Sequence, residues 1–220
     1  MKVGLVVEST TKGLEAVVCP KVLELLSAET GKRIDHVIRT MTNKKLLILG
    51  AADTVRILLQ ENCDRVVVLW DENPPWTPEK DIAEKRCWHV ERQELITNLR
   101  NAQIDRKKVG LVCIEREFET WLLHAPQLLR DVISTRTHKA KVKAFKPLTI
   151  DDPKAALMSL FAKNKTHYNP DVAAMKFARH LSRLDQLKGS DTFRYFAQNV
   201  LGVMPKGWNP FVYHPKGPRQ

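Results

Sequence analysis

Acidic side chains stand shortly after three apolar segments of this sequence, at Glu8, Asp71, Glu117 and Glu119. The segments are residues 3–7 (VGLVV), 66–70 (VVVLW) and Val109–Ile114 (VGLVCI). Unbroken apolar runs rich in β-branched residues are typical of strands buried on both faces of a parallel sheet. Because parallel strands end at one edge of the sheet, where open α/β folds bind ligands, we expect these carboxylates to gather there.

Carboxylates that lie close together repel one another unless a cation neutralises them. Oxygen ligands select a hard metal ion, so the expected cofactor is Mg²⁺ or Mn²⁺. Mg²⁺ held by few carboxylates keeps bound waters and contacts phosphate oxygens, which suits hydrolysis or transfer at a phosphodiester. Simpler explanations stand beside this one. Glu8 could be a helix-start residue favoured by the helix dipole, and Glu117 and Glu119 could be exposed acids in the first turn of a helix.

The segment that organises the chain is 66–73 (VVVLWDEN), which carries Asp71, Glu72 and Asn73 just before two prolines. Periodic apolar residues predict helices around it, and Asp35–Met41 (DHVIRTM) is expected to be a further strand. This alternation predicts an α/β fold with a mostly parallel sheet and right-handed crossovers. The expected helices cover residues 11–26, 43–60 and 77–99, and one more runs through Trp121, Leu122, Leu128 and Leu129.

Turn and capping residues set the expected limits of the first helix. Ser9, Thr10 and Thr11 are expected to cap it, or to hold phosphate through free backbone N–H groups. Pro20 is expected to kink the helix or to begin its second half. Gly31 is expected to end it.

After residue 134 the sequence changes character. Residues 135–150 read as a basic loop, and three helices are expected over 153–162, 170–187 and 190–201. The tail 203–220 is rich in Pro and Gly and reads as extended, with Trp208, Phe211 and Tyr213 available to pack on the body or on a partner. The predicted organisation is an α/β domain over 1–134, a basic loop with a helical appendage over 135–201, and an extended tail over 202–220.

The composition favours a polyanionic partner. The chain has 220 residues, a formal charge of +11 and a pI near 9.6. Such a surface most often binds nucleic acid, although a solvated basic surface or an acidic partner protein would also fit. The expected nucleic-acid contacts are Lys12, Arg136, Lys139, Lys141 and Lys143.

Apolar content and cysteine usage indicate a cytoplasmic protein. No apolar run approaches the ~20 residues needed to cross a bilayer, and the first residues lack the layout of a signal peptide. The cysteines Cys19, Cys63, Cys87 and Cys113 form no CxxC pair, so we expect reduced core residues. Cys87 and His89 offer two zinc ligands, but the second pair that a zinc site needs is missing.

Two motifs resemble the TOPRIM domain, which is shared by topoisomerases, primases, recombination mediators and OLD-type nucleases. They are Val6-Val7-Glu8-Ser9-Thr10-Thr11-Lys12 and VVVLWDEN. A third stretch is similar to the E-x-E-x-W-L-L signature of small stand-alone TOPRIM proteins related to those nucleases: Glu117-Phe118-Glu119-Thr120-Trp121-Leu122-Leu123. Asp152-Pro153-Lys154, Tyr168 and residues 191–196 resemble the C-terminal half of that group. The resemblance covers roughly residues 1–201.

The resemblance implies a role for each matching residue. Glu8 would be the general acid/base or a metal ligand, and Asp71 would bind the metal with Asn73. Glu117 and Glu119 would complete the metal shell. Lys154 would hold the scissile phosphate, although by default a lysine at this place is only a surface residue.

Two departures from the family pattern both remove negative charge. The second Asp of the Asp-x-Asp motif is Asn73, whose amide oxygen can still reach a metal ion but carries no charge. Glu72 does not replace it, because adjacent strand residues face opposite ways. Lys12 stands where nuclease-type members have a second Glu. A topoisomerase is not expected, because the chain is short and its three tyrosines lie in no nucleophile motif.

Two functions follow as hypotheses. The first is a Mg²⁺-dependent TOPRIM nuclease that cleaves DNA or RNA, in anti-phage defence with a partner ATPase. The second is a catalytically degenerate TOPRIM module that binds nucleic acid or a partner protein without cutting.

Overall fold

A four-stranded parallel sheet forms the centre of the protein, in the strand order β2-β1-β3-β4. The structure is a computed structural model that describes residues 1–73 and 87–209. The strands are β1 (Lys2–Glu8), β2 (Asp35–Met41), β3 (Arg65–Asp71) and β4 (Val109–Ile114). The predicted parallel α/β class is confirmed, and the arrangement is Rossmann-like.

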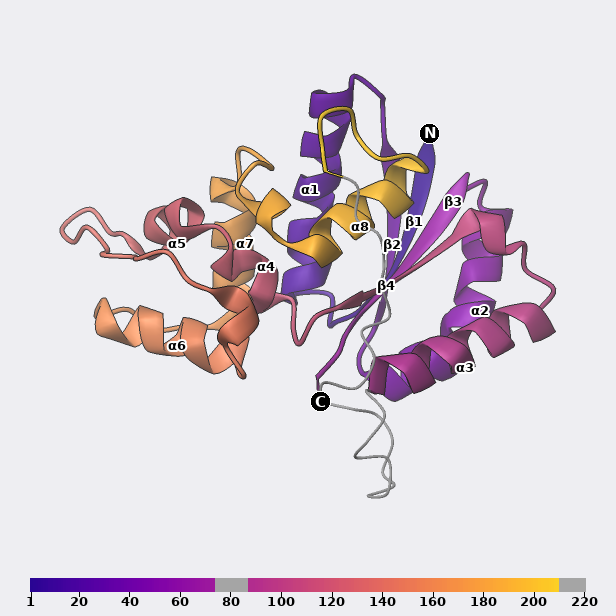
Figure 1. Cartoon of the computed structure of the whole chain (residues 1–220), viewed down its shortest axis with the longest axis horizontal. Helices are drawn as coiled ribbons and strands as arrows, with labels where there is room; N and C mark the ends of the chain where they lie inside the picture. The colour runs from indigo at the N-terminus through magenta and orange to yellow at the C-terminus, as the bar shows by residue number, and fades with distance from the viewer. Residues whose placement is uncertain (74–86, 210–220) are drawn as a thin grey trace.

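Helices cover both faces of the sheet (Figure 1). The helices α2 (Lys44–Gln60) and α3 (Cys87–Asn101) lie on one face. On the other face lie α1 (Leu14–Thr30), α4 (Glu119–Leu123), α5 (Pro126–Ile133), α6 (Pro153–Lys163), α7 (Pro170–His180) and α8 (Asp191–Leu201). Within the described ranges, no helix is both long enough and apolar enough to cross a membrane.

The alternation of strand side chains explains the two layers. In β1, the side chains of Val3, Leu5 and Val7 pack into the layer that contains α1, while Val6 packs into the layer that contains α2. Successive strand residues face opposite sides, so a strand between two helix layers must be apolar on both. This is why an unbroken apolar run identified β1, β3 and β4.

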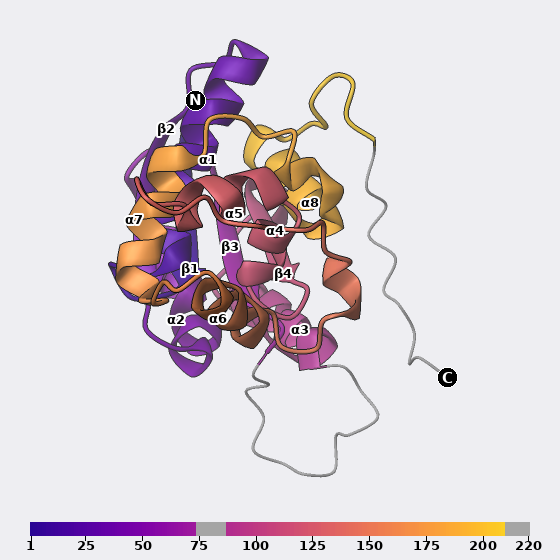
Figure 2. The same ribbon diagram turned by 90° about the vertical axis from the view of Figure 1, so that its left-hand side faces the viewer.

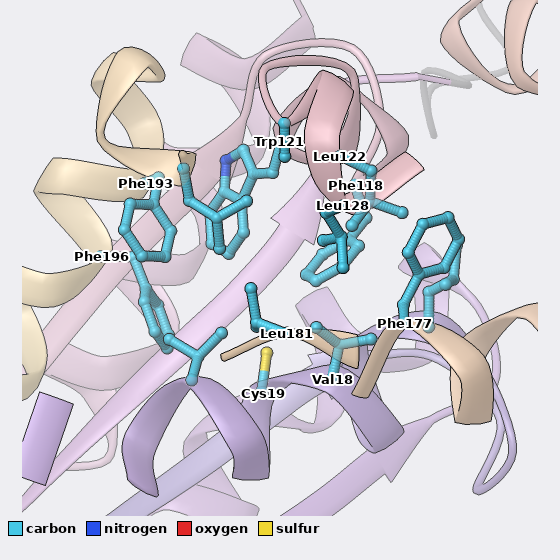
Figure 3. Packing of buried hydrophobic residues seen from close by; sticks show 14 of the residues in the cluster. Val18, Cys19, Phe118, Trp121, Leu122, Leu128, Phe177, Leu181, Phe193 and Phe196 are labelled. Carbon is cyan, nitrogen blue, oxygen red and sulfur yellow. The ribbon is translucent and has the colours of Figure 1, made fainter. Parts of the chain in front are cut away.

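An aromatic cluster joins the C-terminal helices to the segment after β4 (Figure 3). Trp121 is 1% exposed, and its ring lies 5.0 Å from Phe118, 5.2 Å from Phe193 and 5.4 Å from Phe196, measured between ring centroids. Its indole N–H donates to Thr192 Oγ1 at 2.8 Å. The prediction of Trp121 as a core residue is confirmed. Figure 2 shows α4, α5, α6 and α7 together in front of the sheet.

Several predicted helix limits are wrong. The helix through Trp121 and Leu129 is two helices, because Pro126 begins α5 and a proline removes the N–H that a continuous helix needs. The helix expected over 170–187 ends at His180. Short 3₁₀ turns occur at Arg106–Lys108, Pro147–Thr149 and Leu187–Gly189.

The start of α1 also differs from the expectation. The residue at its N-cap is Gly13, so Ser9, Thr10 and Thr11 do not cap it. The helix continues through Pro20 rather than beginning there, and Gly31 ends it with φ at 67° as predicted. The expected start of a helix at residue 77 and the aromatic residues Phe211 and Tyr213 lie outside the described residues. Trp208 does pack on the body, where it is 8% exposed.

Candidate functional site

Asp71, the last residue of β3, lies at the centre of a group of carboxylates. Burial raises its pKa well above the ordinary value, and the nearby carboxylates of Glu15, Glu119, Glu8 and Glu117 raise it further. These residues, named here the acidic cluster, come from β1, α1, β3 and the segment after β4. The structure thus brings Glu8, Glu117 and Glu119 within electrostatic reach of Asp71 at the carboxyl edge, with Glu15 as an additional member; by strand alternation Asp71 leaves the sheet on the α1 side and Glu8 on the α2 side.

Glu8 ends β1 on the side of the sheet that faces α2. Val7 pairs with Leu69 in the parallel register, which places Glu8 near the end of β3. Burial raises the pKa of Glu8 to about 7, while the Lys44 ammonium and nearby backbone N–H groups counteract part of this effect. Its Oε2 atom is buried and has no hydrogen-bond partner among the described residues. Glu8 is thus a partly buried carboxyl that changes its protonation near neutral pH.

Glu15 was not identified from the sequence. It lies in the first turn of α1, its Oε2 accepts a 2.7 Å hydrogen bond from the Ser9 hydroxyl, and burial raises its pKa. Its spacing could have indicated this position, because Glu15 stands three residues before Val18 and four before Cys19, both of which are buried. A glutamate on the apolar stripe of an amphipathic helix points toward the core rather than toward water.

Glu119 is 6% exposed, which excludes the reading of this residue as an exposed first-turn acid. Burial raises its pKa to about 7, and the carboxylates of Glu117 and Glu15 raise it further. The hydroxyl of Tyr168, itself buried, donates to Glu119 Oε1 at 3.3 Å. Tyr168 therefore holds one oxygen of Glu119 in place from the segment that precedes α7.

Replacement of Tyr168 by phenylalanine is expected to lower the free energy of unfolding by about 1 kcal/mol, because one hydrogen bond to a buried carboxyl is lost. The ring should stay in place against Phe161, whose centroid lies 5.2 Å away, so the change isolates the hydroxyl. Urea unfolding of Tyr168→Phe and wild type measures the difference. A variant as stable as wild type would contradict a role for this hydrogen bond.

Glu117 and Lys154 meet where α6 begins. The backbone N–H of Lys154 donates to Glu117 Oε2 at 3.2 Å, and the side chain of Asp152 caps the helix through the N–H of Ala155 at 2.7 Å. The Lys154 ammonium is close enough to the acidic cluster to lower the pKa of Glu117, Glu119 and Glu15. The structure thus brings Lys154 to the predicted site.

The segment after β3 is tied to the segment after β4. The backbone N–H of Asn73 donates to the Arg116 carbonyl at 2.8 Å, and Glu72 Oε2 accepts from the Arg116 N–H at 3.1 Å. Arg116 has φ at 67°, in the left-handed region that non-glycine residues rarely adopt. These contacts fix Glu72 and the backbone of Asn73 directly after Asp71, so Glu72 has a structural contact and Asn73 lies beside the segment after β4.

A buried ion pair lies beside Glu8 on the α2 side. Lys44 Nζ lies 3.5 Å from Glu91 Oε1 and donates to the Glu72 carbonyl at 3.0 Å. The second oxygen of Glu91 accepts from the Trp70 indole N–H at 3.0 Å. Lys44 is 4% exposed and Glu91 is 0% exposed. Sequence reasoning missed both, because each is an ordinary charged residue on a helix until the packing of α2, α3 and β3 is known.

The donor set suits a hard divalent cation with few protein ligands. Glu8 Oε2 and Asp71 Oδ1 are both buried and lack hydrogen-bond partners among the described residues, so each leaves a carboxylate oxygen available. Mg²⁺ is commonly bound through one or two carboxylates while it keeps several waters. Among the side chains that the structure describes, which exclude those of residues 74–89 and 210–220, no group of three or more His, Cys, Asp or Glu is arranged to hold a metal ion.

Comparisons with known proteins identify no relative. No family model, no curated protein and no solved structure matches this chain.

The basic residues expected to contact nucleic acid are all exposed. Lys12 lies in the loop between β1 and α1, next to the acidic cluster in the sequence. Arg136, Lys139, Lys141 and Lys143 lie in the loop between α5 and α6. The side chains of Cys87 and His89, the two ligands of the zinc alternative, lie outside the described part of the chain.

Proposed function

We propose that this protein is a Mg²⁺- or Mn²⁺-dependent TOPRIM-type nuclease that hydrolyses phosphodiester bonds in nucleic acid. One observation carries the proposal: buried carboxylate oxygens of Glu8 and Asp71 without hydrogen-bond partners in the described chain, at the carboxyl edge of a parallel sheet. Without a counter-charge, burial favours the protonated forms of these two carboxyls, and a bound cation would instead favour their ionised forms. The formal charge of +11 fits a polyanionic substrate.

Each residue has a defined part in this proposal. Asp71, Glu119 and Glu117 would hold the cation, and Asn73, two residues after Asp71, would offer a neutral oxygen donor. When bound, the cation supplies charge stabilisation at the phosphate and lowers the pKa of a bound water. Glu8, with a pKa of about 7, accepts or returns a proton near neutral pH, where a general acid/base works best. Lys154 offsets negative charge at the scissile phosphate.

The role of the protein in a cell follows only from the family resemblance. It extends the proposal to anti-phage defence with a partner ATPase. A gene for an ATPase beside the gene for this protein would support that extension.

Replacement of Asp71 by alanine is expected to reduce metal-dependent cleavage at least about 100-fold, because it removes a central carboxylate of the site. The assay incubates wild type and Asp71→Ala with labelled single-stranded and double-stranded DNA and RNA, in Mg²⁺, in Mn²⁺ and in EDTA. Asp53→Ala is the matched control, since it removes one exposed carboxylate from α2. Cleavage that persists in EDTA, or that Asp71→Ala retains, would overturn the proposal.

A second candidate is a degenerate TOPRIM module that binds nucleic acid or a partner protein without cutting it. Asn73 favours it, because an amide in place of a carboxylate weakens metal binding. This candidate predicts no cleavage with any metal, together with salt-sensitive binding that survives Glu8→Gln and Asp71→Asn. Loss of all binding in those two variants would argue against it.

A further inference from the structure

Three lysines in the loop between α5 and α6 project from one side of an extended segment. Lys139, Lys141 and Lys143 are exposed, whereas Ala140 and Val142 between them are 4% and 7% exposed. Alternating exposure is the pattern of extended backbone, in which every second side chain points the same way. Residues two apart in such backbone are about 6.6 Å apart. We name these three residues the lysine row.

The lysine row is held in place by the body of the protein. The N–H of Ala140 donates to Ser134 Oγ at 3.0 Å, and the N–H of Lys141 donates to Asn164 Oδ1 at 3.0 Å. Asn164 is 6% exposed and is itself fixed, because its Nδ2 donates to the Leu160 carbonyl at 2.9 Å. The backbone of the row is therefore positioned before any ligand binds.

The lysine row has no acidic neighbours in the sequence and forms no ion pairs with the described residues. No acidic residue occurs in the sequence between Asp131 and Asp151. None of the three ammonium groups forms an ion pair with the described residues. A ligand with a regular series of negative charges complements such a row. Neighbouring phosphates along one strand of a duplex are farther apart than their axial rise of about 3.4 Å, because they also turn around the axis, and this direct separation is close to one interval of the row.

Helix α6 connects the lysine row to the acidic cluster. Its first turn contacts Glu117 through the N–H of Lys154, and Asn164, which follows its last residue, holds the row. In Figure 1, α6 runs outward from the region of the strand ends toward the loop at the left-hand tip. A helix of 11 residues is about 16 Å long, which corresponds to roughly five nucleotides of duplex.

We propose that the lysine row is a preformed phosphate-binding strand that holds the nucleic-acid backbone one α6 length from the acidic cluster. The inference rests on the proposed nuclease function and adds a length requirement to it. A substrate must extend at least about five nucleotides to one side of the bond that is cut.

Nucleic-acid binding is measured at equilibrium in EDTA, where metal-dependent cleavage does not occur, so the measurement tests the lysine row separately from cleavage. Fluorescence anisotropy measures the affinity of wild type and of the triple variant Lys139→Gln/Lys141→Gln/Lys143→Gln for labelled DNA and RNA of about 20 nucleotides over a series of salt concentrations. Each lost phosphate contact lowers the slope of log affinity against log salt by about 0.7–0.9. The triple variant should therefore lose about 2 from the slope and bind about 100-fold more weakly at about 0.1 M salt.

A second triple variant controls for the loss of charge as such. Lys32→Gln/Lys45→Gln/Lys107→Gln removes three exposed lysines from other parts of the surface and should change the slope by less than about 1. Circular dichroism of both variants verifies that they fold. Equal losses in the two triple variants, or unchanged binding in the row variant, would overturn the proposal. The proposal would also be overturned if the row variant bound nucleic acid as wild type does and lost binding only to phosphatidylserine vesicles or to a poly-glutamate peptide.

Cleavage mapping separates this inference from the proposed function. On end-labelled substrates in Mg²⁺, wild type should leave at least about five nucleotides on one side of each cut, and the row variant should lose that preference. If nothing is cut but the row variant loses binding, the row stands and the nuclease proposal fails. If wild type and the row variant cut at the same positions and bind nucleic acid with the same affinity, the nuclease proposal is supported and the proposed role of the lysine row is wrong.

Discussion

In EDTA, the free energy of unfolding is expected to fall by several kcal/mol as the pH rises from about 4.5 to 7. The reason lies in Glu8 and Glu119, whose pKa is raised from 4.5 to about 7 in the folded protein, mainly by burial. Between these pH values the folded protein keeps protons that the unfolded chain has released. The stabilisation is complete below the unfolded pKa and is lost as the pH rises through the folded pKa. A shift of this size corresponds to about 3 kcal/mol per group, and solvent near the partly exposed Glu8 reduces its share.

Urea unfolding at a series of pH values measures this loss. Glu8→Gln and Glu119→Gln should each flatten the curve, because an amide does not ionise. Glu24→Gln removes an exposed carboxylate that pairs with Lys21 and should leave the shape unchanged. If a cation neutralises the acidic cluster, Mg²⁺ should restore stability mostly above about pH 7, where the carboxylates are ionised. Stability that is flat or rises over this interval in EDTA, or curves of equal shape for all variants, would contradict the role of these two carboxyls.

Replacement of Glu91 by alanine is expected to lower the free energy of unfolding by about 3–5 kcal/mol. The change removes the carboxylate that lies 3.5 Å from the buried Lys44 ammonium, and it also removes the acceptor of the Trp70 indole N–H. Removing one partner of a buried ion pair costs more than the pair itself contributes, because the Lys44 charge stays buried and loses the carboxylate that lies 3.5 Å away. The pair joins α2 and α3 to the end of β3, where Lys44 also donates to the Glu72 carbonyl.

Two companion variants make this prediction specific. Glu24→Ala breaks the exposed pair with Lys21 and should cost less than about 1 kcal/mol. The double variant Lys44→Met/Glu91→Leu removes both charges and should recover much of the stability that Glu91→Ala loses. Urea unfolding compares these three variants with wild type. A Glu91→Ala variant as stable as Glu24→Ala would show that the pair does not act as a buried unit.

Local patterns were sufficient for much of the fold. Strands β1, β3 and β4 were recognised because burial between two helix layers demands apolar residues at nearly every position. The strand β2 also has its predicted bounds, although none of its residues is buried. Errors arose where the pattern of apolar residues continued across a backbone interruption. Apolar residues continue past Ala125, but Pro126 begins a new helix there, and the spacing after His180 continues although the helix stops.

The residues of the candidate site, too, could be predicted only in part. Glu8, Asp71, Glu117 and Glu119 could be placed at one edge from the sequence, because parallel strands end together. Glu15, Tyr168, Lys44 and Glu91 could not, since their contacts depend on how helices pack against strands far away in the chain.

The sequence by itself determined the order of strands and helices, the parallel class and the carboxylates at the strand ends, because each follows from the period of side chains along a single element. Only the tertiary structure decided which carboxyls are buried, which of their oxygens lack hydrogen-bond partners among the described residues, and which lysines form a row. These properties arise from the distances between side chains of different elements, and helix packing sets those distances.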